Sequence, residues 1–546
     1  MELEIFELIL DPKSETQLQK QVYLQLRELI LNGKLLPGVR LPPSRKLAET
    51  IGASRKTVVS AYDQLLAEGY VSSQTGSGTF VSDPSNALSL LRSVSNSTDT
   101  PESSGSSSLS SKRGNDRAAS KSLRNTGDQT PEQKKLPREL LADRPEEPTE
   151  ATVEPDSETE PLSLYARRIG GVDLEISQIE HARFQFFNWQ PAFDELPLVE
   201  WSRIVGKTFR RADVNLVDYA PDPLGHLPLR QTIAERLRRT RGLDCRAEQI
   251  VITCGFSQSI DIVARLHSAE GTELLVENPS YRPVRDIFRT YGVSVRSIAV
   301  DQGGMRTERL AKLPKHNIKS VYVTPSHQFP TGAVLTLARR LELLKWATDC
   351  GAVIIEDDFD SEFRFRGSPI PAMKTLDKEE RVIYLSSFTK VFYPSLAIAF
   401  MVVPSRLIPI YTRARWLASD QLSIQLQDAL AEFISTGMLE RHVKRMRSTY
   451  ALRRKTLLEA IEDHLEGCAT THGDYAGLST LIRLKCDLDD DQIISRAGER
   501  GIVLTSTRTS YTRNAVQGEF ILGYGNLNED EIRKGIMELR LIIKGR

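Results

Sequence analysis

Residues 353–363 read VIIEDDFDSEF, and residues 382–390 read VIYLSSFTK. Each stretch begins with a short apolar run and then turns polar, a pattern that predicts a buried strand with a polar end. The polar residues are Glu356, Asp357 and Asp358 in the first stretch and Ser386, Ser387, Thr389 and Lys390 in the second. In open α/β sheets, ligands bind outside the carboxyl ends of the strands. The two stretches therefore predict a sheet with a functional edge.

Further candidate strands follow Leu164, with helical stretches between them. They are QIVITCG (249–255), TELLVENP (272–279) and SVYVTP (320–325). This alternation predicts an α/β fold with a mainly parallel sheet.

The strand ends carry a lysine, carboxylates, hydroxyl groups and the start of a helix. The strand that ends at Gly255 opens a helix at Ser257, and the free N–H groups of such a helix start bind phosphate. Taken alone, Asp357 and Lys390 at neighbouring strand ends would be a structural ion pair. Together with hydroxyl groups and a phosphate site, they indicate a Schiff-base cofactor instead. Pyridoxal phosphate needs a lysine for its aldehyde, a carboxylate for its pyridine nitrogen, and hydroxyl and N–H groups for its phosphate.

Residues 12–82 follow a different pattern. The stretch QLQKQVYLQLRELILNG has apolar residues at helical spacing and ends at Gly33. A short second helix ends at Gly52, and Ser54 caps a third helix. Alternating residues at 70–81, YVSSQTGSGTFV, predict a β-hairpin. We therefore predict three helices followed by a hairpin.

Charge is balanced over the chain but not within this part. The chain has 72 Lys and Arg against 72 Asp and Glu, so it has no net charge to recruit nucleic acid or membrane at long range. The segment between Arg40 and Thr57 is an exception, because it contains five cationic residues and only one acid, Glu49. The cationic residues are Arg40, Arg45, Lys46, Arg55 and Lys56. A helix that starts with hydroxyl and cationic side chains is typical of a helix-turn-helix that reads the major groove. The alternative is a three-helix bundle with a solvated basic face.

Composition changes sharply after residue 82. Residues 83–130 hold 14 serines, and residues 131–161 are acidic and rich in proline. Such a segment buries too little apolar surface to offset the entropy of ordering it, so we predict a flexible, disordered linker over residues 83–163. A coil of about 80 residues spans roughly 50 Å, more than the ~34 Å of one DNA turn. A poorly patterned folded domain is the alternative.

Cellular location is constrained by the cysteines and the N-terminus. Five scattered cysteines, none in a C-x-x-C pair, fit a reducing cytosol better than a disulfide framework or a zinc site. The first ten residues, MELEIFELIL, lack the basic lead of a signal peptide. The apolar run from Leu396 to Pro404 is too short to span a bilayer. We expect a cytoplasmic protein with no metal site and no membrane partner.

The N-terminal sequence also resembles a known family. Residues 37–81, PGVRLPPSRKLAETIGASRKTVVSAYDQLLAEGYVSSQTGSGTFV, closely resemble the winged helix-turn-helix of GntR-family bacterial regulators. The resemblance implies that the DNA contacts are Arg45, Ser54, Arg55, Lys56, Thr57 and the wing-tip Gly76.

The C-terminal part resembles a second component of the same family. Its motifs are YAPDPLG (219–225), VENPSY (276–281), TPSHQFPTG (324–332), IEDDFDSEF (355–363) and SSFTK (386–390). They resemble the aminotransferase-like domain of MocR-type regulators, the branch of the GntR family that fuses a winged helix to this domain. The resemblance implies a fold-type I domain over residues 164–546, with a smaller C-terminal α+β subdomain and a homodimer whose two heads bind two DNA half-sites.

The resemblance also implies roles within the pocket. Lys390 would be the aldimine lysine, Asp357 would bind the pyridine nitrogen, and Tyr281 would stack on the ring. The residues around the phosphate would be Gly255, Phe256, Ser257 and Ser387, together with Tyr219 reaching the partner subunit's phosphate. Arg508 would bind an effector carboxylate, since guanidinium binds carboxylate bidentately. The alternative is that Arg508 is an ordinary surface arginine.

The sequence departs from the family pattern at two positions. Ala397 stands where the family has an arginine on the phosphate, and Phe359 replaces a tyrosine that contacts the ring oxygen. A hydrogen bond to a charged group contributes about 1.5–3 kcal/mol. Losing the arginine therefore weakens cofactor binding by roughly tenfold to a hundredfold.

These observations predict a DNA-binding transcription regulator rather than an enzyme. Its aminotransferase-like domain is expected to bind pyridoxal phosphate and to sense a small amine or amino acid. Two alternatives stay open: an active aminotransferase with an accessory DNA-binding module, and an aminotransferase-like regulator that works without the cofactor.

Overall fold

The structure is a computed structural model of the 546-residue chain. It describes residues 8, 10–11, 14, 17–31, 34–68, 70–74, 78–82, 162–173, 182–187, 190–211, 213, 216, 218, 222–365, 370–419, 422–473 and 476–544. We call the described residues up to 82 the head and those from 162 onward the body. The predicted linker lies outside the described residues except for its last two positions.

The head is the predicted winged helix-turn-helix. Its elements are α1 (Leu18–Leu31), α2 (Ser44–Thr50), α3 (Arg55–Ala67), β1 (Val71–Gln74) and β2 (Gly78–Val81). The two strands pair antiparallel, as the wing of such a domain requires. The three helices are held together because Leu26, Leu47 and Leu65 are completely buried between them. Ser54 caps α3 as predicted, because its Oγ accepts the Thr57 N–H at 3.1 Å. The predicted helix end at Gly33 lies outside the described residues.

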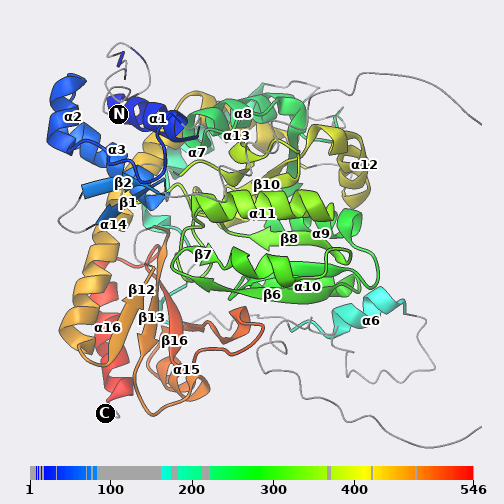
Figure 1. Ribbon diagram of the computed structural model, residues 1–546. Helices are drawn as coiled ribbons and strands as arrows, with labels where there is room; N and C mark the ends of the chain where they lie inside the picture. Colours follow the sequence, from blue (N-terminus) through cyan, green and yellow to red (C-terminus); the bar gives the residue numbers. More distant parts are fainter. Residues whose placement is uncertain are drawn as a thin grey trace, which may run out of the picture.

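The body is built on an eight-stranded sheet (Figure 1). The strand order is β4-β11-β10-β9-β8-β5-β6-β7. The strands are β4 (Ile250–Cys254), β5 (Glu273–Asn278), β6 (Ser294–Asp301), β7 (Gly304–Met305), β8 (Ile318–Val323), β9 (Val353–Asp357), β10 (Val382–Ser387) and β11 (Ile398–Val402). All five predicted strands are confirmed, and β5, β6, β8, β9 and β10 run parallel. The run that starts at Leu396 forms β11, which lies antiparallel between β4 and β10.

Helices cover both faces of this sheet. The helices that pack on the sheet or on its covering helices are α6 (Leu164–Gly170), α7 (Leu198–Arg210), α8 (Leu227–Arg241), α9 (Gly255–His267), α10 (Arg282–Thr290), α11 (Leu337–Cys350), α12 (Ile408–Ala418) and α13 (Ile424–Ser435). Helices α9, α10 and α12 share one buried cluster with the sheet, and α11 shares another on the opposite face. The predicted α/β architecture is therefore confirmed.

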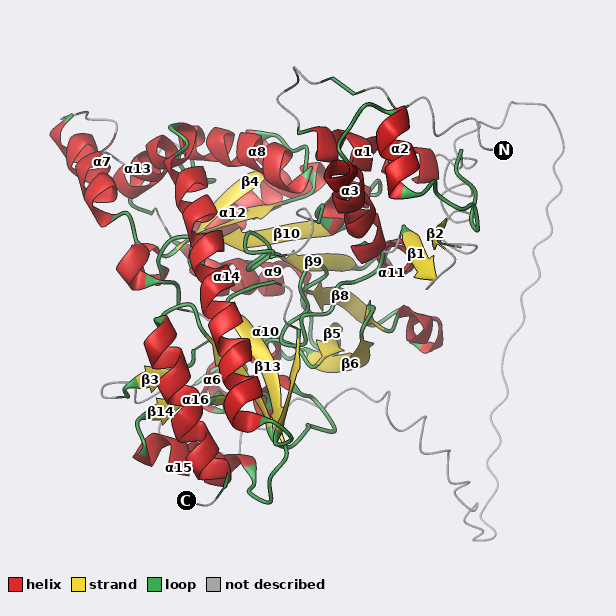
Figure 2. Cartoon of the chain, turned by 90° about the vertical axis from the view of Figure 1, so that its left-hand side faces the viewer, coloured by secondary structure: helices red, strands yellow, loops and turns green. Residues whose placement is uncertain are grey.

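A smaller C-terminal subdomain follows the long helix α14 (Met438–Leu465), as Figure 2 shows. Its four-stranded sheet has the order β12-β13-β16-β15, and a separate parallel pair joins β14 to β3. The elements are β3 (Phe184–Gln185), β12 (Ala469–His472), β13 (Ser479–Leu484), α15 (Asp490–Glu499), β14 (Ile502–Val503), β15 (Thr505–Ser506), β16 (Glu519–Gly523) and α16 (Glu529–Ile543).

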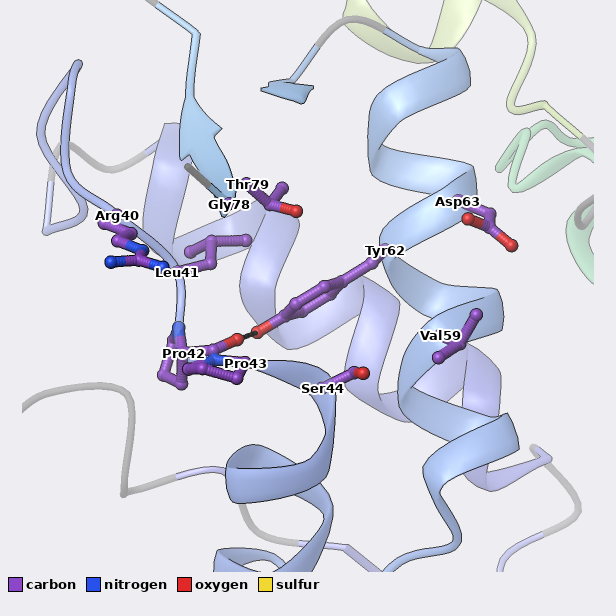
Figure 3. A pocket seen from close by; sticks show the side chains of 10 residues that line it. All are labelled: Arg40, Leu41, Pro42, Pro43, Ser44, Val59, Tyr62, Asp63, Gly78 and Thr79. Atoms are coloured by element: carbon purple, nitrogen blue, oxygen red, sulfur yellow. Dashed lines mark hydrogen bonds between the residues drawn. The ribbon is translucent and has the colours of Figure 1, made fainter. Parts of the chain in front are cut away.

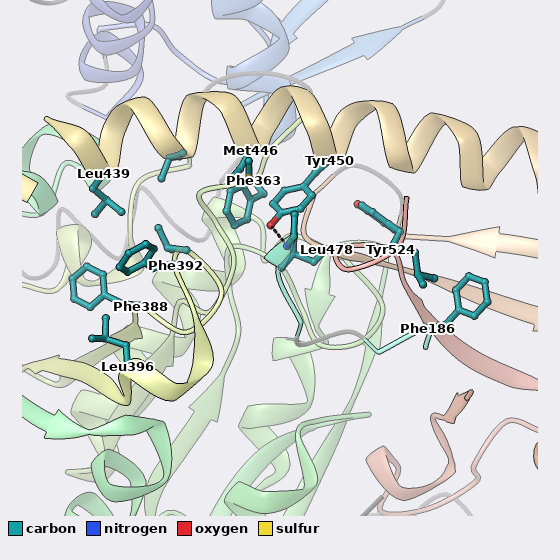
Figure 4. Close-up of a cluster of buried hydrophobic side chains, with 14 of the residues drawn as sticks. Phe186, Phe363, Phe388, Phe392, Leu396, Leu439, Met446, Tyr450, Leu478 and Tyr524 are labelled. Atoms are coloured by element: carbon teal, nitrogen blue, oxygen red, sulfur yellow. Dashed lines mark hydrogen bonds between the residues drawn. The ribbon is translucent and has the colours of Figure 1, made fainter. Parts of the chain in front are cut away.

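An aromatic cluster beneath α14 joins the subdomain to the large sheet (Figure 4). The rings of Phe363 and Tyr450 meet edge to face with their centroids 4.9 Å apart, and the Tyr450 hydroxyl accepts the Ala192 N–H at 3.0 Å. Phe388 and Phe392, on either side of Lys390, are buried in the same cluster. This packing fixes the segment that carries the candidate lysine. Within the described part of the chain, no helix is long and apolar enough to cross a membrane.

Candidate functional site

The predicted strand ends meet at one edge of the large sheet. Strands β10, β9 and β8 are neighbours in the sheet and run parallel, so their carboxyl ends lie side by side. The three successive acids at the end of β9 separate there, because neighbouring residues of an extended chain point in opposite directions. The Glu356 carboxylate accepts the N–H groups of Met373 and Lys374, whereas Asp358 pairs with Arg241 at 2.7 Å. Asp357, between them, faces Tyr322.

Asp357 is a buried carboxylate with one oxygen in use. Its Oδ2 accepts the Tyr322 hydroxyl at 2.6 Å, and its Oδ1 is buried without a hydrogen-bond partner among the described residues. Burial raises the pKa of Asp357 to about 7, against the lowering effects of the Tyr322 hydrogen bond and the Lys390 charge. An unpartnered carboxylate oxygen in this position is suited to accept an N–H from a bound molecule.

Lys390 lies close to this carboxylate and to an aromatic ring. Its Nζ lies 4.3 Å from the centroid of Phe359, a cation–π arrangement. Burial lowers the pKa of Lys390, whereas the charges of Asp360 and Asp357 raise it. A lowered lysine pKa increases the fraction of neutral amine, which is the form that reacts with an aldehyde.

Four aromatic rings form a chain of contacts that ends at Phe359, the ring on which Lys390 lies. Tyr281 lies edge to face with Phe256 and with Phe329, at centroid distances of 6.0 and 5.6 Å. Phe329 in turn meets Phe359 at 6.1 Å. His327 also stacks on Phe359 at 5.8 Å, and its Nδ1 lies 2.8 Å from Oδ1 of Asp360. Phe359 thus contributes an apolar surface to the site where the family pattern has a tyrosine.

The predicted phosphate corner lies at the start of α9. Gly255 begins the helix with a φ of 77°, and no atom lies within 4 Å of the position that a side chain would take there. Phe256 and Ser257 form the first turn, which contains no acidic residue. Ile398 pairs with Cys254, so Ala397 lies beside this corner and offers only a methyl group. The corner therefore offers backbone N–H groups and hydroxyls to an anion, without a cation from position 397.

These groups fit pyridoxal phosphate, the cofactor that the resemblance implies. The decisive observation is the buried Oδ1 of Asp357, which has no hydrogen-bond partner among the described residues and matches the pyridine N–H. When bound, the cofactor would supply an aldehyde that reacts with amines. Lys390, Asp357 and Tyr281 would hold it from three sides, with Gly255, Phe256, Ser257 and Ser387 at its phosphate. Tyr219 lies outside the described residues.

The predicted DNA contacts that the structure describes lie in α2 and at the start of α3. Ser54, Arg55 and Lys56 are exposed at the start of α3, and Arg45 is exposed on α2, where it lies 3.5 Å from Glu49. Figure 3 shows the neighbouring cavity of about 250 Å³ between β2 and α3, where the Tyr62 hydroxyl donates to the Pro42 carbonyl at 2.8 Å. This bond holds the turn before α2 against α3. The wing-tip Gly76 lies outside the described residues.

Comparison with known families matches both parts. Residues 18–81 match the model of bacterial regulatory proteins of the gntR family, and residues 205–520 match the model of class I and II aminotransferases. The probable rhizopine catabolism regulatory protein MocR of Rhizobium meliloti is 33% identical over 98% of this chain and 95% of its own length. The chain belongs to the MocR-type branch of the GntR family.

Other relatives of this MocR-type chain are known over similar lengths. The pyridoxine biosynthesis transcriptional regulator PdxR of Corynebacterium glutamicum is 28% identical over 97% of both chains. Among solved structures, the kynurenine aminotransferase of Pyrococcus horikoshii in complex with PMP aligns with a TM-score of 0.62 at 27% identity. It covers 68% of this chain and 92% of its own. Full-length relatives are thus regulators, and the body has an aminotransferase fold.

One predicted residue of this MocR-type chain, Arg508, pairs with an acid of the small subdomain. Arg508 is exposed and donates two hydrogen bonds of 2.8 Å to the Asp491 carboxylate. These hydrogen bonds raise the pKa of Arg508. Binding of an effector carboxylate remains a prediction for Arg508, and it requires the pair with Asp491 to open.

Sequence reasoning missed Tyr322 and Phe329. Tyr322 lies inside β8, where its spacing is that of any core residue, and its hydroxyl meets Asp357 only through the pairing of β8 with β9. Phe329 belongs to the TPSHQFPTG motif, and its position within that motif was the only available signal.

Proposed function

We propose that this chain is a DNA-binding transcription regulator whose body binds pyridoxal phosphate and senses a small amine or amino acid. The observation that carries the proposal is the presence, in one MocR-type chain, of an exposed basic helix start and of a buried Lys390 whose charge acts on Asp357, a carboxylate with one oxygen that has no hydrogen-bond partner among the described residues. A homodimer would place two heads on two half-sites of double-stranded DNA. We place this activity in the bacterial cytoplasm, on the nucleoid.

Sensing rather than turnover is supported by the two departures. Ala397 supplies no cation to the phosphate, and Phe359 supplies no hydroxyl to the ring. A weakly held cofactor dissociates and rebinds as its concentration changes, which suits a protein that responds to cofactor or amine concentration. The response also requires that the ligand bind two conformations of the protein with different affinities.

An aminotransferase activity is the second candidate, since the body aligns with a solved aminotransferase at 27% identity. The two functions differ in a direct measurement. Several turnovers with an amino donor and a keto acid would favour the enzyme, whereas a single exchange of amino group would favour the sensor.

Two experiments on the full-length chain test the proposal. Titration with pyridoxal phosphate should produce the visible absorbance of a lysine-linked cofactor, which Lys390→Ala should abolish. Selection from a random duplex library should yield a specific DNA site, whose binding Arg55→Ala should weaken. A colourless protein at saturating cofactor would contradict the first part, and failure to enrich any DNA would contradict the second.

A further inference from the structure

Asp360 is an acid of the IEDDFDSEF motif to which the proposed cofactor pocket gives no role. It follows Phe359 directly, and only 2% of its surface is exposed. Its Oδ1 lies 2.8 Å from Nδ1 of His327, a residue of the TPSHQFPTG motif. Two of the motifs that carry the family resemblance therefore meet in one buried contact between a carboxylate and an imidazole.

The surroundings of His327 fix the position of its ring proton. The ring is buried, and its Nε2 has no hydrogen-bond partner among the described residues. A charged N–H without a partner is more costly in a protein interior than the lone pair of a neutral ring. The ring proton therefore belongs on Nδ1, from which it donates to Asp360. Such a hydrogen bond stabilises the ionised form of the carboxylate.

The small subdomain closes over this pair at Gly477. The glycine has a φ of 85°, and a side-chain carbon there would clash with Oδ2 of Asp360 and with Cε1 of His327. Its N–H donates to the Phe363 carbonyl at 2.9 Å, and its carbonyl accepts the Tyr524 hydroxyl at 2.9 Å. A backbone segment held at both of its polar groups thus lies against the pair. Charges act more strongly on one another in such an interior than in water.

Phe359 connects the pair to Lys390. His327 stacks on the Phe359 ring with the centroids 5.8 Å apart and the planes at 26°, and Lys390 Nζ lies 4.3 Å from the centroid of the same ring. Burial lowers the pKa of Lys390, whereas the charges of Asp360 and Asp357 raise it, Asp360 more strongly. The acid that most favours the ammonium form is therefore not the one proposed for the pyridine nitrogen.

The two acids that precede this segment differ from Asp360. Asp357 accepts the Tyr322 hydroxyl, and burial raises its pKa to about 7, so it is only partly ionised at neutral pH. Asp358 forms an ion pair with Arg241 at 2.7 Å. Among the described residues, Asp357 and Asp360 are the acids whose charges act on Lys390. Asp360, whose donor is a neutral ring, keeps its charge for this interaction.

We propose that His327 and Asp360 form a positioning pair that holds Lys390 as an ammonium and so restrains its reaction with an aldehyde. In that reaction the nitrogen bonds to the aldehyde carbon, the aldehyde oxygen leaves as water, and the ammonium gives up its protons. The pair makes the loss of the first proton less favourable. The charge relation does not depend on the proposed function, whereas its effect on cofactor attachment rests on it.

Competitive acetylation of the full-length chain without cofactor measures the charge state of Lys390. Acetic anhydride reacts with the neutral amine, so the rate at Lys390 relative to the exposed Lys534, followed by mass spectrometry across pH, reports the titration of Lys390. In Asp360→Asn the midpoint should fall by about one pH unit, and acetylation at neutral pH should be about tenfold faster. Asp349→Asn, at an exposed position on α11, is the control. An unchanged or higher midpoint in Asp360→Asn would overturn the proposal.

Variants of His327 keep the test decisive if Asp360→Asn does not fold. His327→Phe keeps a ring for Phe359 and removes the N–H donor, so Asp360 takes up a proton and Lys390 should be acetylated at least about threefold faster at neutral pH. His327→Gln keeps an amide donor and should stay within about twofold of the wild type. If the ring only filled space, the Phe variant would match the wild type more closely than the Gln variant. That order would overturn the role of His327.

Titration with pyridoxal phosphate separates this proposal from the proposed function. At neutral pH the visible absorbance should appear about tenfold faster in Asp360→Asn than in the wild type, because more of the lysine is neutral. Faster acetylation of the variant with no absorbance in either protein would reject the proposed cofactor and leave the role of the pair standing. Equal acetylation and equal rates of absorbance in the two proteins would reject the pair and leave the cofactor standing.

Discussion

Tyr322 donates its hydroxyl to Oδ2 of Asp357 at 2.6 Å, and the second oxygen of that carboxylate is buried without a partner among the described residues. The bond occupies one oxygen of the carboxylate and leaves Oδ1 available. A carboxylate fixed in this way is prepared for one further donor, and the pyridine N–H of the proposed cofactor is such a donor.

Removing the charge at this position should weaken cofactor binding. Asp357→Asn leaves a neutral group of the same shape, so the charge-assisted bond is lost and the dissociation constant for pyridoxal phosphate should rise at least about tenfold. An absorbance titration measures it. Asp349→Asn, a surface substitution on α11, should bind as the wild type does. Wild-type affinity in Asp357→Asn would contradict the assignment.

Cofactor affinity should depend on pH in a defined direction. The pKa of Asp357 is about 7, and the ionised carboxylate is the form that binds a protonated ring nitrogen. Affinity should therefore fall as the pH drops below about 7. Tyr322→Phe removes a hydrogen bond that lowers this pKa, so the midpoint should move to higher pH. An unchanged or lower midpoint in Tyr322→Phe would show that this carboxylate does not control binding.

Restoring the missing arginine should strengthen binding. Ala397 already has a φ of 50°, so a longer side chain meets no new backbone strain. Ala397→Arg should lower the dissociation constant for pyridoxal phosphate by about tenfold or more through a charge-assisted hydrogen bond to the phosphate. Ala397→Met, similar in length and uncharged, is the control. Equal affinities of the two variants would place the phosphate elsewhere.

The start of α3 should carry the electrostatic part of DNA binding. Lys56→Ala removes one cation, so affinity should fall and the slope of log affinity against log salt should decrease by about one. Lys534→Ala, on α16 and also exposed, removes the same charge and should not have this effect. A similar loss in both variants would mean that the head surface has no special role.

Much of this architecture was predictable from local pattern. The five strands were visible as apolar runs with polar ends, and Ser54 was visible as a helix cap. The insertion of β11 between β4 and β10 was not, because an apolar run does not reveal its neighbours. The same holds for Tyr322, whose partner is set by strand register.

The position of the head was the largest omission. Composition predicted a head that acts at a distance, and nothing local marks Leu337 or Glu68 as contacts. They meet only because α3 and α11, far apart in sequence, are placed end to end. Buried acids such as Glu68, which follows an otherwise ordinary amphipathic helix, are a signal that a second surface covers them.

The most direct test of the central claim is the affinity of the full-length chain for its selected DNA, measured with and without saturating pyridoxal phosphate. The account predicts that the cofactor changes the affinity of the wild type and leaves that of Lys390→Ala unaltered. An identical affinity of the wild type in both conditions would contradict it.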